Sequence, residues 1–220
     1  MPEPRGDVLV VGGGAVGLAC AQALADAGRS VRVLERGRIG AATSRGNCGT
    51  LTPSHALPLA APGMVAKAVG WMLKPDAPFL VRPRLDPELW GWLLRFAARC
   101  DARTFEAAIA PKAALLSASQ TLLAALVEAR GLDCGHRRDG LVYVFRDAVN
   151  FDAAVRSHAR LRAFGIAVDE WDGARAEAEE PALKPGVAGA LFFPGDGHLR
   201  PERYTAELAR VARDDGAVLE

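Results

Sequence analysis

The pattern with the clearest chemical meaning is Gly12-x-Gly14-x-x-Gly17, three spaced glycines near the start of the chain. It lies between an apolar run at 8–11 and a helix-like segment at 15–27, the context that a dinucleotide-binding turn requires. In such a turn, backbone N–H groups at a helix N-terminus face a pyrophosphate. Spaced glycines also occur for packing alone, so the residues that follow decide between the two interpretations.

An acidic residue at the end of the next apolar run completes the pattern. The run is Val31 to Leu34, and Glu35 follows it directly. A carboxylate at this place can accept hydrogen bonds from both hydroxyls of an adenosine ribose, and it disfavours the 2′-phosphate of NADP. The glycines then have separate tasks: the first allows a tight turn, the second a close approach to the pyrophosphate, the third helix–strand packing. Together these residues predict an adenine dinucleotide site.

The segment after Glu35 favours FAD over NAD. An NAD dehydrogenase would continue with another helix and strand of the same sheet, whereas residues 37–62 are rich in Gly, Ser, Thr, Asn and Pro. We expect this segment to be mostly loop, and a loop of this length is usually functional. Its small residues and backbone donors suit a flat isoalloxazine ring, so the expected cofactor is FAD.

These residues need a parallel sheet to position them. Strand, helix and strand within 8–34 predict a right-handed crossover, with Val16, Ala19, Ala23 and Leu24 sharing one helix face. Further along, apolar spacing predicts helices at 115–130, 148–164 and 201–213, and strands at 140–146, 168–171, 188–193 and 217–220.

Composition narrows the class of protein. The 220 residues are 50% hydrophobic and 24% charged with a net charge of +1, which is typical of a folded protein and argues against nucleic-acid binding. The uncharged stretch 8–25 is better explained as a buried strand and helix than as a membrane span or signal peptide. The four cysteines form no close pair with each other or with histidine, so we expect neither a metal site nor a disulfide framework: Cys20, Cys48, Cys100 and Cys134.

The glycine pattern with Glu35, followed by Thr43-Ser44-x-x-Asn47-x-Gly49, resembles the D-amino-acid oxidase superfamily of FAD enzymes. Within it, segments 58–63 and 67–72 and the pair Ala77-Pro78 are similar to the bacterial D-amino-acid dehydrogenase branch. Segments 140–143, 180–183 and 194–197 also follow the family's style. The resemblance covers nearly the whole chain.

The resemblance implies an FAD-dependent oxidative deamination of D-amino acids to 2-oxo acids and ammonia, with electrons passed to a quinone or other acceptor. Alternatives are an oxidase or dehydrogenase of glycine, sarcosine or opine-type amines, or an inactive nucleotide-binding fragment that needs a partner. It names no catalytic acid or base. It implies FAD contacts at Gly12, Gly14, Ala15, Val16, Gly17, Glu35, Arg36, Thr43, Ser44, Asn47 and Gly49.

The fold implied is α/β: a Rossmann-like FAD-binding βαβ domain with an α+β substrate-domain portion. The expected parts are 1–55 for the start of the FAD domain, 56–195 for the substrate or cap region and 196–220 for the return to the FAD domain. Family members are much longer, and C-terminal segments complete their FAD domain. We therefore expect a fragment or half of a split protein, with an uncovered sheet face, that needs a C-terminal half or partner chain.

Several side chains keep two interpretations. His55 and His198 either approach the substrate or lie on the surface, and Arg45 either binds an anion or is an exposed loop residue. Cys48 is either a covalent flavin link or merely a small residue. The aromatic stretch from Trp71 to Phe96 either packs internally or touches a membrane or quinone. The expected location is cytoplasmic, with peripheral attachment to the inner face of the bacterial inner membrane as the alternative.

Overall fold

The computed structural model describes residues 7–72, 76, 80–82 and 84–220, so Ala77 and Pro78 lie outside the described residues. The chain divides into two compact units, which are described separately. The first unit comprises residues up to 52, 119–141 and 194–220, and the second comprises 53–118 and 142–193. Segment 119–141 falls in the first unit, whereas the sequence placed it in the middle region.

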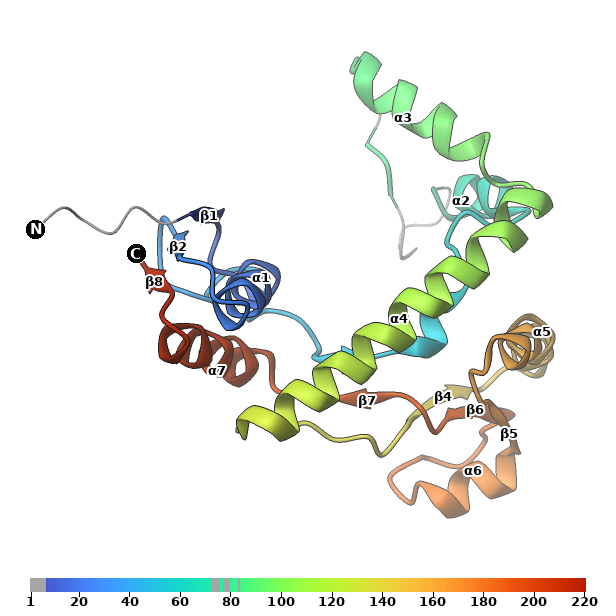
Figure 1. Ribbon diagram of the computed structural model, residues 1–220. Coiled ribbons are helices and arrows are strands. Elements are labelled where there is room, and N and C mark those ends of the chain that lie inside the picture. Colours follow the sequence, from blue (N-terminus) through green and yellow to red (C-terminus); the bar gives the residue numbers. More distant parts are fainter. Residues whose placement is uncertain (1–6, 73–75, 77–79, 83) are drawn as a thin grey trace, which may run out of the picture. The chain divides into compact units, whose positions relative to one another are not determined.

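The first unit contains the predicted parallel sheet. Its strands are β1 (Val8–Val11), β2 (Val31–Leu34) and β8 (Val218–Leu219), in the order β1-β2-β8 (Figure 1). Helix α1 (Ala15–Asp26) connects β1 with β2, and both pairings are parallel. The crossover and the late strand expected at 217–220 are therefore confirmed.

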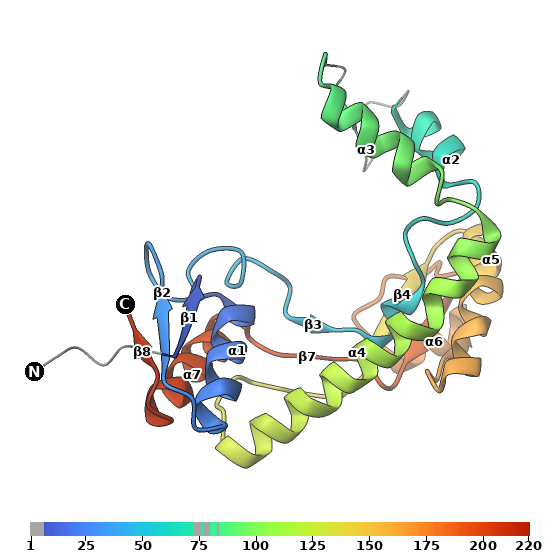
Figure 2. The same ribbon diagram turned by 45° about the horizontal axis from the view of Figure 1, so that its top comes forward.

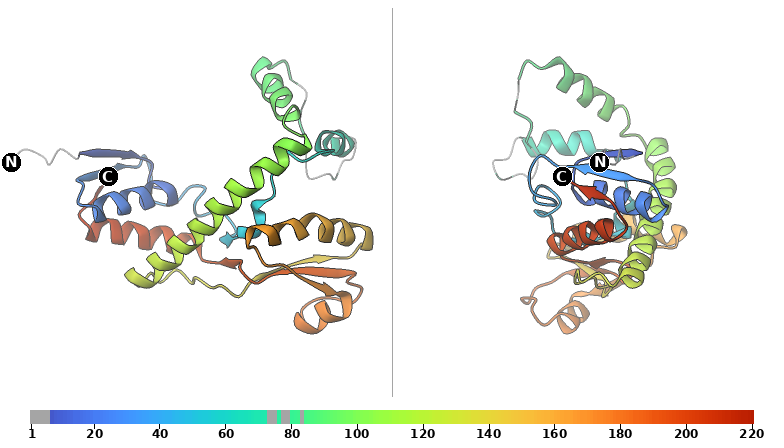
Figure 3. Two further views of the ribbon diagram at one scale, coloured as in Figure 1. Left: turned by 45° about the vertical axis from the view of Figure 1, so that its right-hand side comes forward. Right: turned by 60° about the vertical axis from the view of Figure 1, so that its left-hand side comes forward.

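Two helices cover only one face of this sheet. Helices α1 and α7 (Pro201–Asp214) lie on the same side of the strands (Figures 2 and 3), and their alanines pack against the inward valines of β2. The opposite face displays Leu9, Val11 and Val218, which are 57%, 82% and 42% exposed. Parallel sheets normally have both faces covered. The described residues thus leave one apolar sheet face open, as the sequence predicted.

The predicted face of α1 is confirmed only in part, because Ala19 and Leu24 pack against buried clusters and the other two residues do not. Leu18, Ala21 and Ala25 are buried, whereas Val16 is 80% exposed and Ala23 is also exposed. Leu18 packs against residues of α7 in a separate small cluster. The helix is rotated relative to the expectation because α1 must bury residues against both the sheet and α7, and a local periodicity contains no information about α7.

Helix α4 (Ala102–Arg130) is much longer than the expected helix at 115–130. Leu123, Leu126 and Val127 pack in a cluster with Leu199 and Val211 of the first unit, which explains why segment 119–141 belongs there. By length and composition alone, α4 is the one described helix long and apolar enough to cross a membrane; 11% of its most apolar window is buried. Gly131, with φ of 58°, follows the helix end as expected.

A polar network holds the end of α4 against the other helices of the first unit. Both terminal nitrogens of Arg130 bind the carboxylate of Asp215, with Nη1 at 2.9 Å from Oδ2. The Gln22 amide of α1 donates to the same carboxylate at 3.3 Å. Hydrogen bonding from Arg130 holds the pKa of Asp215 below its usual value. The carboxylate therefore joins α1, α4 and the end of α7.

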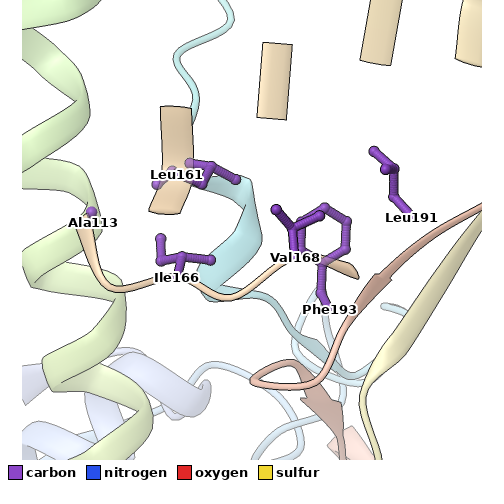
Figure 4. Packing of buried hydrophobic residues seen from close by; sticks show 7 residues of the cluster. Ala113, Leu161, Ile166, Val168, Leu191 and Phe193 are labelled. Atoms are coloured by element: carbon purple, nitrogen blue, oxygen red, sulfur yellow. The ribbon is translucent and has the colours of Figure 1, made fainter. Parts of the chain in front are cut away.

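The second unit is built around a three-stranded sheet in the order β4-β6-β5. Leu161, Ile166, Val168, Leu191 and Phe193 form its main buried cluster (Figure 4). The strands are β4 (Leu141–Phe145), β5 (Asp169–Asp172) and β6 (Gly189–Phe193), and the helices are α5 (Ala148–His158), a 3₁₀ turn (Ala159–Phe164) and α6 (Gly173–Glu179). The strands and the helical span 148–164 are confirmed, whereas α6 was not predicted.

The segments predicted as loop or unassigned apolar region also contain short elements. Strands β3 (Thr50–Leu51) and β7 (Gly197–His198) pair antiparallel in the first unit, and a 3₁₀ turn (Pro53–Ala56) begins the second. Helices α2 (Met64–Met72) and α3 (Pro87–Ala97) occupy the aromatic stretch, and neither has a buried residue. Segment 37–62 is mostly loop, as expected, with these two short elements at 50–51 and 53–56 as the exceptions.

The network around Asp215 predicts acid sensitivity of the first unit. Because the folded pKa of Asp215 is lowered, its stabilisation is complete above the ordinary carboxyl pKa and is lost as pH falls through the folded pKa. Asp215→Asn should lower the free energy of unfolding at neutral pH by about 1 kcal/mol. It should also flatten the acid limb of stability against pH, measured by urea unfolding.

Asp152→Asn is the matched control, since Asp152 is exposed on α5. An Asp215→Asn protein whose stability depends on pH as steeply as that of the Asp152→Asn protein would contradict the assigned role.

Candidate functional site

The glycine turn between β1 and α1 has the backbone geometry that the sequence predicted. Gly12 adopts φ of 104°, a conformation that side-chain-bearing residues rarely adopt. A Cβ on Gly17 would stand 2.0 Å from the Gly12 carbonyl oxygen and 3.3 Å from Val10 Cγ1. These distances leave no room for a methyl group, so the first turn of α1 lies directly against the end of β1.

The Glu35 carboxylate is fixed by backbone N–H groups. Its Oε2 accepts from Gly13 N at 2.8 Å and its Oε1 from Gly37 N at 3.1 Å. The hydrogen bond from Gly13 is the main cause of a pKa below the usual value for Glu35. The carboxylate is therefore ionised and held beside the glycine turn, where its remaining lone pairs suit ribose hydroxyl donors.

The N-terminus of α1 has no acidic residue in its first turn, and its cap residue Gly14 has no side chain to close it. The hydroxyl of Ser44 accepts from Ala15 N at 3.0 Å, and a Cβ on Gly14 would stand 3.0 Å from that oxygen. The positive end of the helix dipole and the hydroxyl thus lie side by side. A phosphate is the kind of anion that such an arrangement binds.

The loop that contains Ser44 is braced by one side chain. The Asn47 amide donates to the carbonyl oxygens of Thr43 and Ser44, and its Oδ1 accepts from Gly49 N at 2.8 Å. A Cβ on Gly49 would stand 2.1 Å from the Leu199 carbonyl oxygen. Asn47 and Gly49 therefore position the loop against the rest of the unit through contacts within the protein.

A cavity of about 150 Å³ lies between this loop and α7. Ligand pockets usually measure roughly 300–1,000 Å³, so the described residues close only part of a dinucleotide site. Burial raises the pKa of Tyr204 on its wall, which keeps that hydroxyl protonated. The cavity is lined by Ala15, Ser44, Asn47, Gly49, Thr50, Leu51, Leu123, Leu199, Pro201, Tyr204 and Thr205.

The remaining candidates lie in varied surroundings. Val16, Arg36 and Thr43 are exposed around the turn and loop, and Arg45 and Cys48 are exposed as well. His198 lies in β7 of the first unit, where its backbone pairs with Thr50. In the second unit, His55 Nε2 lies 2.7 Å from the Tyr143 hydroxyl. Their proposed contacts with cofactor or substrate stay predictions.

Two glycines with structural roles at this site were missed. Gly13 donates to Glu35, and a Cβ on it would stand 2.5 Å from Ile39 Cδ1. Gly40, with φ of 69°, donates to the Gly13 carbonyl and would meet Thr205 with any side chain. The run Gly12-Gly13-Gly14 is the only sequence signal that points to Gly13. Both residues act through backbone groups, which a pattern of side chains does not reveal.

These groups fit the adenosine and pyrophosphate parts of FAD. Glu35 presents acceptors for a ribose, and the α1 N-terminus with Ser44 presents donors for phosphate oxygens. No residue with a Cβ could replace Gly17 without displacing the turn. Across the described residues, no group of three or more His, Cys, Asp or Glu side chains is placed to hold a metal ion. The chemistry of the donors therefore suits a dinucleotide.

Comparison with known proteins agrees with this interpretation. The family described as "FAD dependent oxidoreductase" matches residues 7–220. A D-amino acid dehydrogenase of Agrobacterium fabrum is 34% identical over 214 residues, which are 96% of this chain and 51% of that protein. A D-amino acid dehydrogenase of Methylobacterium nodulans is 36% identical over 211 residues, covering 92% of this chain and 50% of that protein.

The fold is also similar to that of a solved oxidase. The crystal structure of glycine oxidase from Geobacillus kaustophilus superimposes with a TM-score of 0.70 at 24% sequence identity. The match covers 98% of this chain and 46% of the oxidase. The chain therefore spans about half the length of the curated relatives and of the solved structure that it matches.

Glu35→Gln should weaken both the turn and the binding of FAD. The amide of Gln has one acceptor oxygen for the two N–H donors, Gly13 and Gly37, and its NH₂ group would face the second donor. Because one hydrogen bond is lost and two donors then face each other, FAD affinity should fall roughly tenfold or more. Because the pKa of Glu35 is lowered in the folded chain, the carboxylate stays ionised below the ordinary carboxyl pKa, and wild-type affinity should decrease only as pH falls through the lowered pKa. Quenching of flavin fluorescence measures the affinity.

Urea unfolding of the same proteins without FAD provides a second measurement. Glu128→Gln is the control, because Glu128 is exposed on α4. If the two variants were equal both in FAD affinity and in unfolding free energy, the role given to Glu35 would be refuted.

Proposed function

The chain belongs to the DAO family of FAD-dependent oxidoreductases, and from this premise we propose that it supplies the FAD-binding half of a D-amino-acid dehydrogenase. The main supporting observation is the site of the first unit, where a turn, a fixed carboxylate and a braced loop together suit the dinucleotide part of FAD. The D-amino acid dehydrogenases that match nearly the whole chain support the choice of substrate.

The reaction proposed is oxidative deamination of a D-amino acid. FAD, when bound, supplies the acceptor for a hydride from the substrate α-carbon. The substrate loses two electrons and becomes an imine, which water hydrolyses to a 2-oxo acid and ammonia. A quinone or another carrier is the proposed final electron acceptor.

The residues of this chain contribute binding and orientation. Glu35 would hold the adenosine end of FAD, and Ser44 with the N-terminus of α1 would hold its pyrophosphate. Asn47 holds the loop in shape through three hydrogen bonds to backbone groups. Precise placement of the reacting atoms accounts for much of the rate in such a reaction, because hydride transfer requires close approach and alignment.

No general acid or base is assigned to the chain. Among the described residues that line the cavity, Tyr204 is the one titratable side chain, and burial keeps it protonated. A substrate amine needs only to be neutral when its α-carbon gives up a hydride, and a pH near the amine pKa achieves this without a protein base. The described part of the site is consistent with catalysis by placement.

A second candidate is oxidation of glycine or another small amine. It is raised by the name of one neighbour, because the solved structure on which the fold superimposes is a glycine oxidase. The two candidates differ in substrate and in acceptor. An oxidase passes electrons to oxygen and produces peroxide, whereas a dehydrogenase does not.

We further propose that the site needs a second half, either a longer continuation of the chain or a separate partner chain. Two observations support this requirement. The sheet of the first unit leaves Leu9, Val11 and Val218 exposed on one face, and the matched relatives are about twice as long as the matched segment. The small cavity volume agrees with an incomplete site.

The function predicts a specific pattern of flavin reduction. The 220-residue chain, produced with the second half of a matched D-amino acid dehydrogenase, should bind FAD, and its visible flavin absorbance should bleach when D-alanine is added without oxygen. L-alanine is the stereochemical control, and glycine and sarcosine test the second candidate. Bleaching with glycine or sarcosine but not D-alanine, followed by peroxide formation in air, would replace the dehydrogenase proposal with the oxidase one.

The chain produced alone tests the need for a second half. It should bind FAD weakly and show no bleaching with D-alanine. A stable monomer that retains flavin and bleaches would show that the 220 residues already form a complete site.

A further inference from the structure

Three helices of the first unit contribute to the wall of the cavity beside Ser44. Ala15 belongs to the first turn of α1, Leu123 to α4 and Tyr204 to the first turn of α7. Helices α1 and α7 lie side by side (Figures 2 and 3), and Leu18 of α1 packs in one cluster with residues of α7. A ligand in the cavity would therefore meet the starts of both helices.

The cavity lies next to the predicted pyrophosphate position and away from the predicted ribose position. Ala15 and Ser44, which suit phosphate oxygens, line it, whereas Glu35, which suits the adenosine ribose, does not. FAD is a linear molecule in which the pyrophosphate joins adenosine to a ribityl chain, and the ribityl chain carries the isoalloxazine. The part of FAD that would enter the cavity is therefore the ribityl chain.

The size of the cavity fits the ribityl chain better than the ring system. Its volume of about 150 Å³ is the share of about five water molecules in the liquid, at roughly 30 Å³ each. A ribityl chain is a narrow, flexible polyol, whereas the isoalloxazine is a rigid plane of three fused rings. The described wall thus encloses room for a polyol chain.

The Tyr204 hydroxyl is a polar group of this wall without a protein partner. Its half-buried ring packs against the two clusters that contain Leu199 and Leu208. Burial and the Cys134 thiol raise the pKa of Tyr204, and no hydrogen bond from the described residues contributes to that shift. A protonated phenol is a donor, and a donor removed from water without a partner costs free energy. The wall therefore presents a donor that no described protein group uses.

Three other polar side chains of the wall already make hydrogen bonds within the protein. The Ser44 hydroxyl accepts from Ala15 N at 3.0 Å. The Thr205 hydroxyl donates to the Pro201 carbonyl oxygen at 3.0 Å. The Asn47 side chain is bonded to backbone groups of its own loop. Tyr204 differs from these three, because its hydroxyl is available to a ligand.

We propose that Tyr204 is a further cofactor-binding residue, whose hydroxyl donates a hydrogen bond to the ribityl chain of FAD in this cavity. The assignment rests on the proposed function, because it takes FAD as the cofactor. It adds to the site a side chain of α7, which lies far from the glycine turn and from the loop 43–49 in the sequence. The orientation of the ribityl chain determines where the isoalloxazine lies, so Tyr204 would act as a positioning residue.

FAD and ADP form a pair of probes for this contact. ADP contains adenosine and pyrophosphate but has no ribityl chain. Tyr204→Phe removes the hydroxyl and keeps the ring that packs against the core. It should weaken FAD binding by about fivefold, as expected for the loss of one hydrogen bond, and leave ADP binding unchanged. Isothermal titration calorimetry of the 220-residue chain measures both affinities.

The second tyrosine of the chain provides a matched control. Tyr143→Phe removes a hydroxyl of the second unit that lies 2.7 Å from His55 Nε2, and it should leave both affinities unchanged. Ser44→Ala removes the acceptor beside the start of α1 and should weaken FAD and ADP alike. Circular dichroism and urea unfolding without ligand check that all three variants fold.

Nuclear magnetic resonance reports on the Tyr204 hydroxyl directly. The chain has two tyrosines, so in the Tyr143→Phe protein a ¹³C label at the tyrosine Cζ gives the signal of Tyr204 alone. That signal should shift when FAD is added and stay in place when ADP is added. A purely structural role of Tyr204 would give no such difference between the two ligands.

The outcomes separate this assignment from the proposed function. Equal losses of FAD and ADP affinity in Tyr204→Phe, no loss of either, or an FAD-specific loss without the shift of the Cζ signal would overturn the role of Tyr204. In each of these cases the wild type would still bind FAD, and the proposed function would stand. A wild-type chain that binds no FAD, alone or with the second half of a matched D-amino acid dehydrogenase, would overturn both.

Discussion

The structure of the first unit depends on one close contact, between the backbone of α1 at Gly17 and the carbonyl of Gly12. With a Cβ only 2.0 Å from that oxygen, no other residue type can occupy position 17. The contact brings α1 directly against the end of β1, so the helix N-terminus opens where the chain leaves the sheet. In the same turn, Gly13 N donates at 2.8 Å to Glu35 at the end of the next strand. Donors for phosphate and acceptors for ribose thus become neighbours through a single backbone approach.

The residue pattern predicted the helices and strands whose conformation depends mainly on residues near them in the sequence. The strands at 8–11 and 31–34 and the helix ended by Gly28 follow from β-branched runs and from a glycine at positive φ. The face of α1 did not follow, because Leu18 is buried by α7, nearly two hundred residues later in the chain. Strand β3 has only two residues and exists through pairing with β7, so no local periodicity could reveal it.

At the site, the sequence predicted the contributions of side chains but not those of backbone groups. Glu35 and Ser44 are side chains in a recognisable spacing, and the structure places both beside the turn. Gly13 and Gly40 act through N–H groups and through the absence of a side chain, and apart from the glycine run 12–14 nothing in the residue pattern distinguished them from other glycines. Asn47 was predicted to contact FAD, yet its amide already makes three hydrogen bonds inside the loop. These bonds fix the shape of the loop, and the contact of Asn47 with FAD stays a prediction.

The two exposed apolar surfaces have different physical requirements. The open face of the β1-β2-β8 sheet carries Leu9, Val11 and Val218 together with the Arg32–Glu220 ion pair. Among the described residues its outer strands β1 and β8 are paired on one side only, so its natural cover is polypeptide that supplies helices or further strands. The apolar side chains left exposed on α2 and α3 lie on helices, which satisfy most of their own backbone hydrogen bonds. Burial of those side chains therefore needs no partner for the main chain, whereas a cover for the sheet face also has to satisfy strand edges.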